Sequence, residues 1–497
     1  MRHLRYPATR GPCRLRLRTE NVQAPRVGTP EQQREIFFQC TANKPKDCNY
    51  ISETFYRDLY VDQAIFFLFA PFPSAAFAQT EPTPAPEQTV AAAVSAGFNS
   101  ADTAWMLTAT VLVLLMTLPG IVLFYSGLMR AKNALSLAAQ ALAATALITL
   151  VWAIAGYSLA FTADSPWLGG IDRMMAQGLG APGAAGHEMA KNIPEPVFFM
   201  FQLAFAVITF ALVLGAVVER MRIGSIMVFC VLWLLLIYAP VAHWVWHPGG
   251  WLAQMGHMDF AGGTVVHVLA GSSGLVAAMV LGKREGFGTE PMMPHNLLTT
   301  MLGAGLLWIG WFGFNAGSAL EAGTRAGNAM VATHFSASAG CFMWGLCELV
   351  QRKKISLLGL CSGAIAGLVA VTPASGFVDL WGGVVIGLCA GLACYLAATQ
   401  FKARTGIDDS LDVFALHGVG GLLGSVLTPL LASAAIAPVT ATVLTNTLGA
   451  LAVLVYAAVM TFVILQIIQL LLPLRVTPAQ EHEGLDLAQH GEQLSGS

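Results

Sequence analysis

Two histidines lie inside long apolar segments of the chain, and their side chains have a clear capacity for chemistry. His267 lies in DFAGGTVVHVLAGSSGLV and His417 in LDVFALHGVGGLLGSVL. An ionisable side chain at bilayer depth costs about 2.5 to 3.5 kcal/mol on insertion scales, so it usually faces the protein interior and marks a substrate or proton path. If the two imidazoles touch, they can share one proton through an N–H···N bond and offer a donor and an acceptor to a small polar substrate.

An aspartate lies on the N-terminal side of each histidine, at the expected edge of the hydrocarbon. These are Asp259 and Asp412. We expect each to support its histidine electrostatically or to fix the start of a helix. Two similar arrangements far apart in the sequence indicate two related halves, and such halves often frame a transporter's substrate path.

The elements that must position these residues are membrane helices. The composition is 56% hydrophobic and 11% charged, with 50 glycines. Apolar stretches of roughly 20 residues recur from residue 101, each long enough to cross about 30 Å of hydrocarbon as a helix. We predict an all-α polytopic membrane protein with about eleven transmembrane helices, arranged as a five-plus-five inverted repeat and one extra C-terminal helix. The expected spans are 103–127, 134–161, 195–219, 223–246, 261–282, 296–317, 327–350, 356–373, 378–400, 411–434 and 441–473.

The basic residues of the connections predict the orientation, because cytoplasmic loops hold an excess of Lys and Arg. Alternate connections carry most of those that follow residue 100: Arg130, Lys132, Arg220, Arg222, Lys283, Arg284, Arg352, Lys353, Lys354, Lys402, Arg404 and Arg475. The other side holds Arg173, Lys191 and Arg325. This pattern places the start of the first span outside the cell and the C-terminus in the cytoplasm.

The segments outside the spans have different compositions. Residues 1–78 form a polar leader that ends in AIFFLFAPFPSAAFA, where Ala76 and Ala78 fit an A-x-A cleavage pattern. We predict a secretory signal cleaved after Ala78, the alternative being an uncleaved interfacial segment. Residues 79–100 follow as a Pro-rich extracytoplasmic linker, 101–477 form the membrane domain and 478–497 a cytoplasmic regulatory tail. The net charge of -2 and the cysteine spacing indicate no nucleic-acid partner, metal site or disulfide framework.

Several motifs in order closely resemble the ammonium transporter (Amt/Mep/Rh) family, bacterial type. They are LPGIVLFYSGL, DFAGGTVVHVLAGSSGLVAAMVLGKR, GWFGFNAGSA, SGAIAGLVAVTPASG, DVFALHGVGG and the tail EHEGLDLAQHGE. The resemblance covers about residues 101–493. It implies an eleven-helix bundle in the inner (plasma) membrane, assembled as a homotrimer with one pore per subunit. It also implies ammonium, ammonia and methylammonium as substrates, with no enzyme chemistry and no cofactor.

The resemblance assigns the pore residues. His267 and His417 match the family's paired pore histidines, while Phe205 and Phe314 match the two stacked phenylalanines that close the outer mouth. Ammonium would lose its proton near this gate, because carrying a bare charge through an apolar lining is costly. Ammonia would then move along the histidine pair.

The resemblance also assigns an external recruitment site. Trp246, Ser318 and again Phe205 match it, with Trp244 and Trp251 as alternatives to Trp246. Aromatic faces attract a partly desolvated cation by about 0.5 to 2 kcal/mol, and a serine oxygen can accept an N–H bond.

The tail and the remaining histidines leave alternatives open. The tail's resemblance implies docking of a PII-type nitrogen-regulatory protein, whereas its composition alone favours a disordered stub. One alternative function is an ammonium sensor acting through such a partner; another is a redox protein with the pore histidines as haem ligands. Among the other histidines we expect a satisfied core residue at His334, a solvated one at His187, and interfacial ones at His243, His247 and His257.

Overall fold

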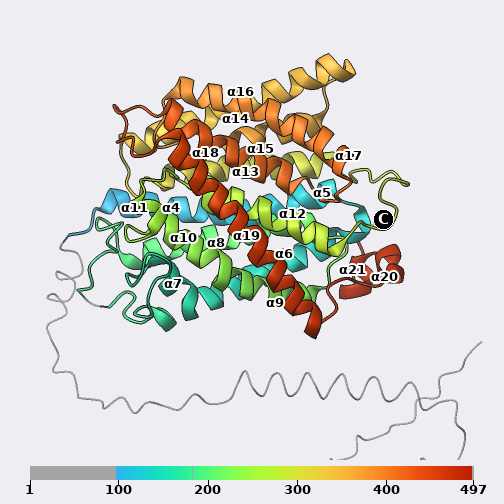
Figure 1. The fold of residues 1–497 in the computed structure, drawn as a ribbon, viewed down its shortest axis with the longest axis horizontal. Coiled ribbons are helices and arrows are strands. Elements are labelled where there is room, and N and C mark those ends of the chain that lie inside the picture. The colour runs from blue at the N-terminus through green and yellow to red at the C-terminus, as the bar shows by residue number, and fades with distance from the viewer. Residues whose placement is uncertain (1–96, 182, 495–497) are drawn as a thin grey trace, which may run out of the picture. The chain divides into compact units, whose positions relative to one another are not determined.

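The computed structural model describes residues 97–181 and 183–494, so the predicted signal segment and most of the linker lie outside the described residues. The described residues form helices and connecting loops, as Figure 1 shows. The helices up to the first histidine segment are α4 (Ser100–Leu115), η1 (Met116–Ile121), α5 (Val122–Leu128), η2 (Ala131–Asn133), α6 (Ala134–Val151), η3 (Trp152–Gly156), α7 (Tyr157–Phe161), η4 (Met174–Ala176), α8 (Glu195–Val217), α9 (Ile223–Trp233), η5 (Leu234–Tyr238), α10 (Ala239–Trp246), α11 (Trp251–Gln254), η6 (Gly263–Val268) and α12 (Leu269–Leu281). Those that follow are α13 (Leu297–Gly317), α14 (Thr324–Arg352), α15 (Leu357–Val371), α16 (Leu380–Leu396), η7 (Ala397–Phe401), α17 (Lys402–Thr405), η8 (Phe414–Gly418), α18 (Val419–Leu431), α19 (Val443–Leu471), α20 (Pro478–Glu483) and α21 (Leu485–His490).

The helices confirm the prediction of an all-α polytopic membrane protein. Within the described part of the chain, nine helical segments are long and apolar enough to cross a membrane. They are Ser100–Leu128, Ala131–Phe161, Glu195–Val217, Ile223–Gln254, Gly263–Leu281, Leu297–Gly317, Leu380–Thr405, Phe414–Leu431 and Val443–Leu471. The two remaining expected spans correspond to α14, which is richer in polar residues, and to α15, which is shorter.

Several of these segments change from α to π geometry part-way along their length. Pro119 lies inside η1, where it supplies no backbone N–H donor to the turn. The turns η6 and η8 carry the two apolar-segment histidines and lead directly into α12 and α18. The same local geometry at both histidines agrees with two related halves. π turns also occur frequently at functional sites.

Small residues allow the helices of the second half to pack closely. A Cβ atom at Gly340 of α14 would lie 2.9 Å from the backbone nitrogen of Gly367 in α15, so a larger residue would separate the two helices. The Ser336 hydroxyl donates to the Gly367 carbonyl, 2.8 Å away, at the same contact. Helix α19 crosses the bundle diagonally in Figure 1 and packs against α12, α18 and α9, as expected for one helix added to paired halves.

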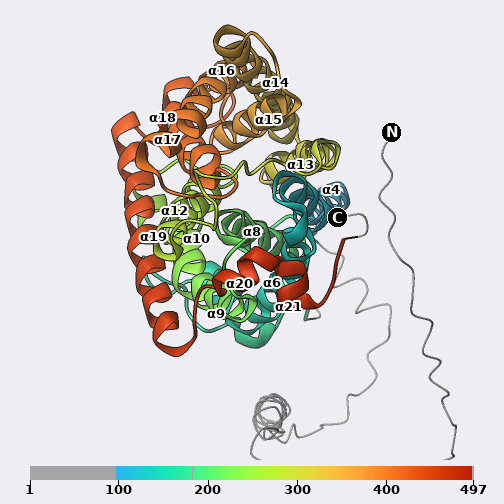
Figure 2. The ribbon, with the colours of Figure 1, turned by 90° about the vertical axis from the view of Figure 1, so that its right-hand side faces the viewer.

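The tail forms two short helices docked on the bundle beside α6, which Figure 2 shows from one end. Both carboxylate oxygens of Asp486 accept backbone N–H groups at the start of α6, from Leu135 at 3.1 Å and Ser136 at 2.7 Å. Glu481 is 1% exposed and pairs with Arg475 at 2.7 Å. Residues 478–490 are therefore held by buried polar contacts rather than lying free as a stub.

Candidate functional site: a histidine pair beneath stacked phenylalanines

The two apolar-segment histidines contact each other in the centre of the bundle. The Nδ1 atoms of His267 and His417 are 3.2 Å apart, and the side chains are 1% and 3% exposed. A hydrogen bond between two ring nitrogens needs one donor and one acceptor. One imidazole therefore donates its Nδ1–H, and the Nδ1 of the other accepts it. The Nε2 atom of His267 is buried and has no hydrogen-bond partner among the described residues.

Glycines make this contact possible. A Cβ atom at Gly271 would overlap the backbone of Gly418, and one at Gly421 would lie 3.1 Å from the Cβ of His267. The start of α12 can therefore approach η8 and α18 closely only because neither helix carries a side chain at the crossing. The separation of the two rings depends directly on these positions.

Asp259 fixes the start of the turn that carries His267. Its carboxylate accepts the backbone N–H groups of Gly262, Gly263, Thr264 and Val265, at 3.0, 2.6, 3.0 and 3.0 Å. Burial raises its pKa to about 6, while the four N–H bonds oppose that rise. Of the two roles expected for this residue, the contacts support helix fixation.

Asp412 does not occupy the corresponding place in the second half. It is partly exposed, adopts a positive φ of 58° and pairs with Lys402 at 3.2 Å. The buried carboxylate is Asp409, which accepts the Phe414 N–H at 2.7 Å at the start of η8. Burial and the neighbouring Asp412 charge raise the pKa of Asp409 to about 6. Sequence reasoning missed Asp409, although its spacing to His417 equals that of Asp259 to His267.

Two phenylalanines lie above the pair. The rings of Phe205 and Phe314 stack with their centroids 4.2 Å apart and their planes at 22°, and both are buried. Phe314 lies 6.0 Å from the His267 ring, and Trp311 stacks on the same ring at 5.5 Å. A cavity of about 10 Å³ lies among these rings, which is room for about one water-sized molecule. Its lining is largely apolar: Met116, Ile121, Phe124, Tyr125, Ile208, Leu212, Val266, His267, Leu307, Trp311, Phe314, Ile365 and His417.

A recess of about 50 Å³ lies on the other side of Phe205. Trp246 faces Phe205 edge-on, with ring centroids 5.7 Å apart, and its Nε1–H donates to the Asp259 carbonyl at 3.0 Å. The Ser318 hydroxyl donates to the Phe314 carbonyl at 2.8 Å, which leaves its oxygen lone pairs available. The full lining is Met189, Phe201, Gln202, Phe205, Trp246, Phe260, Ser318 and Leu320.

Of the three tryptophans considered for this recess, the structure places Trp246 there. Trp244 instead donates its Nε1–H to the Trp167 carbonyl at 2.6 Å, and Trp251 packs against the same Trp167 ring. Gln202 also lines the recess, and its buried Oε1 has no partner in the described part of the chain. Sequence reasoning missed Gln202 because a glutamine within an apolar run carries no motif of its own.

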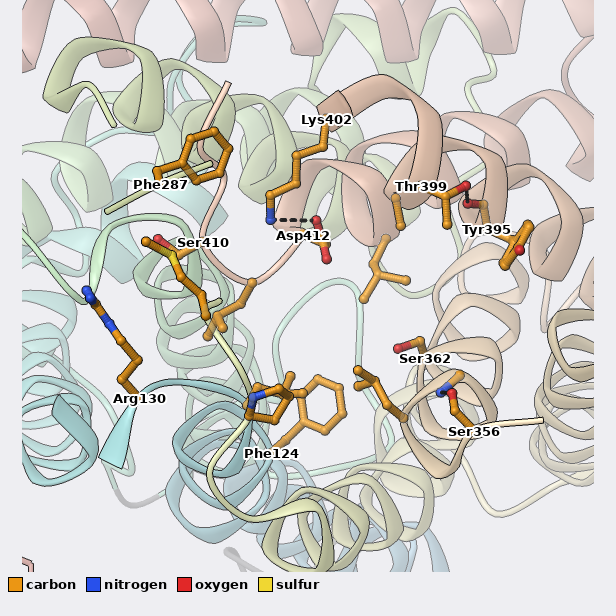
Figure 3. A pocket seen from close by; sticks show the side chains of 18 of the residues that line it. Phe124, Arg130, Phe287, Ser356, Ser362, Tyr395, Thr399, Lys402, Ser410 and Asp412 are labelled. Atoms are coloured by element: carbon orange, nitrogen blue, oxygen red, sulfur yellow. Dashed lines mark hydrogen bonds and ion pairs between the residues drawn. The ribbon is translucent and has the colours of Figure 1, made fainter. Parts of the chain in front are cut away.

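A larger cavity of about 520 Å³ lies on the side of the histidine pair away from the Phe205 recess, and Figure 3 shows side chains around it. We call the line from the recess through the histidine pair to this cavity the track. Phe124 and Leu416 line it, and Phe124 also lines the small cavity beside the histidines. Basic residues from four different connections line it together: Arg130, Arg284, Arg352 and Lys402. These connections were predicted to share one side of the membrane, and they meet at one cavity.

The carboxylates at this inner cavity pair with those basic groups. Glu219 is 1% exposed and lies 2.6 Å from Arg130 and 2.7 Å from Arg284, while Arg284 also contacts Asp408 at 2.8 Å. Although burial opposes it, bonding to the Arg284 guanidinium lowers the pKa of Asp408 overall. The network joins the connections of both halves beneath the histidine pair.

The expectations for the other histidines were wrong in five cases. His334 is exposed on the side of α14, near the Trp308 ring at 5.4 Å, rather than buried in the core. The other four are buried in the protein rather than solvated or interfacial: His187, His243, His247 and His257 are 9%, 0%, 3% and 7% exposed. Hydropathy places a residue in a helix or loop but does not identify the face that a neighbouring element covers.

The geometry argues against the alternative of a haem held between the two histidines. A bis-histidine haem needs an iron atom and a porphyrin plane between two ring nitrogens, and the 3.2 Å contact leaves no room for them. Within residues 97–181 and 183–494, no cluster of three or more His, Cys, Asp or Glu side chains is placed to hold a metal ion.

A multi-span helical bundle with a narrow, mostly apolar track between two recesses defines the class of membrane transporters and channels. Comparison with known proteins specifies the class further. The family model described as Ammonium Transporter Family matches residues 104–494, and the chain belongs to this family. Membership makes it a multi-pass membrane transporter rather than an enzyme.

Individual relatives agree across the membrane domain. The chain is 45% identical over 401 residues to an ammonium transporter of Bacillus subtilis, covering 79% of this chain and 97% of the relative. It is 41% identical to ammonium transporter Amt1 of Archaeoglobus fulgidus, covering 79% and 99%. Among solved structures, Saccharomyces cerevisiae Mep2 matches with a TM-score of 0.71 at 35% identity, covering 78% and 92%. A sensor Amt protein matches with a TM-score of 0.73 at 29% identity, covering 78% and 98%.

Proposed function

We propose that this ammonium transporter recruits the ammonium ion in the outer recess, removes a proton near the stacked phenylalanines and passes ammonia along the histidine pair. Supporting this route, the recess, the Phe205–Phe314 stack and the two histidines lie in succession through ring contacts. The inner cavity receives the product at the far end.

The recess suits a small cation that can donate hydrogen bonds. Trp246 and Phe205 present aromatic rings, which favour a cation without fixing it by an ion pair. The lone pairs of Ser318 and the unpartnered Gln202 carbonyl can each accept an N–H, which methylammonium also offers. Among the described residues, no carboxylate lines this recess, which favours rapid onward movement over tight binding.

The proton is removed because the next cavity cannot solvate a charge. Its lining supplies few polar atoms and its volume of about 10 Å³ leaves no room for a hydration shell. The single observation that carries the proposal is the 3.2 Å contact between His267 and His417 beneath the phenylalanine stack. One shared proton between two buried rings gives ammonia an acceptor and a donor without placing two charges together.

An ammonium pulse applied to proteoliposomes tests the route. We expect the wild-type protein to give an ammonium-selective signal, and the His267→Leu/His417→Leu double variant to lose the signal or to admit potassium. A current would indicate that the proton also crosses, whereas internal alkalinisation without current would indicate net movement of ammonia. A double variant with unchanged selectivity and rate would contradict the proposed role of the histidines.

A sensor is the second candidate, because a solved sensor Amt protein shares the fold. It would act through a PII-type partner at the inner face, where the docked tail and the basic residues of the large cavity provide an interaction surface. Wild-type protein that binds ammonium but gives neither current nor alkalinisation would favour sensing. Unchanged capture of a PII-type protein after deletion of residues 478–497 would count against tail-dependent docking.

We also propose an assembly and a location, which the family resemblance and the charge distribution support. We place the protein in the inner (plasma) membrane as a homotrimer, with the mature N-terminus outside and the tail in the cytoplasm. The meeting of four basic connections at one cavity supports the orientation. The proposed division is a leader with signal (1–78), a linker (79–100) and the membrane domain (101–477). Mass spectrometry of the mature N-terminus tests the first boundary, and a peptide starting at Gln79 is expected. Native mass spectrometry of the purified protein tests the trimer.

A further inference from the structure

His243, on the helix that carries Trp246, has both ring nitrogens against backbone carbonyl groups. Its Nδ1 lies 3.0 Å from the Ala160 oxygen and its Nε2 lies 2.7 Å from the Ser165 oxygen. A carbonyl oxygen only accepts, so each nitrogen must carry a proton, and a neutral imidazole carries one. The contacts therefore require an imidazolium, although the side chain is 0% exposed.

The neighbouring groups are arranged to support that charge. The His247 ring stacks parallel to His243, with centroids 4.5 Å apart and planes at 13°. His247 accepts the Gly249 N–H at its Nδ1, so its own proton is on Nε2, which lies 2.7 Å from a carboxylate oxygen of Glu188. A cation over a neutral aromatic face, with a carboxylate behind it, is a favourable arrangement.

The other titratable groups nearby do not take this role. His187 accepts the Met189 N–H at Nδ1 and bonds the Phe161 carbonyl through Nε2, which makes it neutral, in agreement with the lowering of its pKa by burial. From α7 and the loop that follows it, the groups on the His243 ring are backbone carbonyls, and Asp164 beside Ser165 is exposed. The hydrogen bonds thus assign the second proton to His243.

These contacts bind the end of α7 and the loop after it to the outer end of α10. The same loop also accepts the Trp251 N–H through the Pro166 carbonyl at 3.1 Å, and the Trp244 Nε1–H through the Trp167 carbonyl. His243 therefore contacts both the last turn of α7 and the loop that follows it. Trp246 follows it on α10 by three residues, so the loop buttresses the helix end that places the Trp246 ring against Phe205.

We propose that His243 is a positioning residue whose doubly protonated ring clamps the loop onto α10 and thereby holds Trp246 in the outer recess. The inference rests on the recruitment role proposed for Trp246. When His243 loses its second proton, one carbonyl faces a nitrogen lone pair and that half of the clamp is lost. Ammonium capture is then strongest at acidic external pH and weakens as the pH rises, with a smaller effect on the maximal rate.

The test is the external-pH profile of KM and maximal current for the full-length protein in proteoliposomes, expressed per ammonium ion concentration. The informative variant is His243→Gln, because one amide nitrogen carries two N–H groups at every pH. Comparing variant and wild type at each pH cancels the ammonia–ammonium equilibrium. We expect the wild-type KM to rise about three- to tenfold towards alkaline pH, the net scale of one hydrogen bond, and the His243→Gln KM to stay flat.

Two controls separate the clamp from general effects. His334→Gln removes an exposed histidine far along the chain and should keep the wild-type pH profile. A ¹⁵N spectrum of the histidine rings of wild-type protein should show a ring with both nitrogens protonated at neutral pH, absent in His243→Gln. A wild-type spectrum without such a ring, or a His243→Gln variant with the wild-type KM profile, would overturn the proposal. If wild-type protein transports nothing at any pH, the proposed transport route fails, while the spectrum still decides the protonation of His243.

Discussion

Substitution of Gly271 by alanine should separate the two histidines without removing either of them. The added Cβ would overlap the Gly418 backbone and lie 3.1 Å from the His417 carbonyl carbon. Carbon atoms in contact are about 3.5 to 4.0 Å apart, so α12 and η8 must part by about 1 Å. A shift of that size takes the Nδ1 atoms from 3.2 Å to about 4 Å, which is too far for a hydrogen bond.

We therefore expect Gly271→Ala to fold but to lose selective ammonium transport nearly as fully as the double leucine variant. The assay is the ammonium-evoked signal in proteoliposomes, beside a potassium pulse, with thermal unfolding to confirm the fold. Gly305→Ala is the matched control, because a Cβ there meets no described atom within 4 Å and alanine favours the helix by about 0.5 to 1 kcal/mol. Transport by Gly271→Ala at the wild-type rate and selectivity would refute the dependence on ring contact.

Three further predictions concern the groups around the track. Burial raises the folded-state pKa of Asp259 and Asp409 from 3.8 to about 6, so each protonated carboxyl stabilises the fold at acidic pH, and about 3 kcal/mol of unfolding free energy per residue is lost as the pH rises from 4 to 6. Thermal unfolding measured across this pH range should show a smaller loss of stability in Asp259→Asn and Asp409→Asn. Trp246→Leu should raise the KM for ammonium about tenfold, the scale of a desolvated cation–π contact, whereas the same change at Trp244 should act mainly on stability; an equal KM rise in both would contradict the placement of the recess. Glu481→Gln should free the tail by weakening its buried bond to Arg475, seen as faster proteolysis after residue 475, and unchanged cleavage would show that other contacts suffice.

Hydropathy predicts much of this fold because a chain that crosses lipid must satisfy its backbone hydrogen bonds within each segment, which an apolar helix does. The expected span 134–161 corresponds to the helical segment Ala131–Phe161, and 195–219 to Glu195–Val217. The apolar criterion does not identify α14, whose polar residues face neighbouring helices: Ser336 bonds to α15 and Thr333 to Asn315 of α13. A polar face packed against protein lowers hydropathy without preventing a helix from spanning.

The candidate site was predictable where residue type and duplication coincide. Two histidines in apolar segments indicate buried ionisable groups, and the structure brings them into contact. Phe205 could be singled out only by resemblance, since one phenylalanine in an apolar helix has no distinguishing pattern. Asp409 illustrates a signal that was present but not used, because equal spacing to the histidine distinguishes it from Asp412. The protonation of His243 depends on carbonyl groups of another segment, which no local pattern reveals.

The placement of the buried carboxylates also bears on why a cation would not be trapped in the track. Asp259 and Asp409 lie near the two histidines in sequence, yet both are bonded to backbone N–H groups at helix starts rather than lining the small cavity. A carboxylate facing that cavity would hold ammonium and potassium alike by charge. Because both carboxylates bond to the backbone, a cation meets aromatic faces on the outer side of the Phe205–Phe314 stack. On the other side of the stack it meets the histidine pair, which shares one proton between its Nδ1 atoms. In the proposed route, discrimination would then depend on whether the ion can give up a proton, which ammonium can do and potassium cannot.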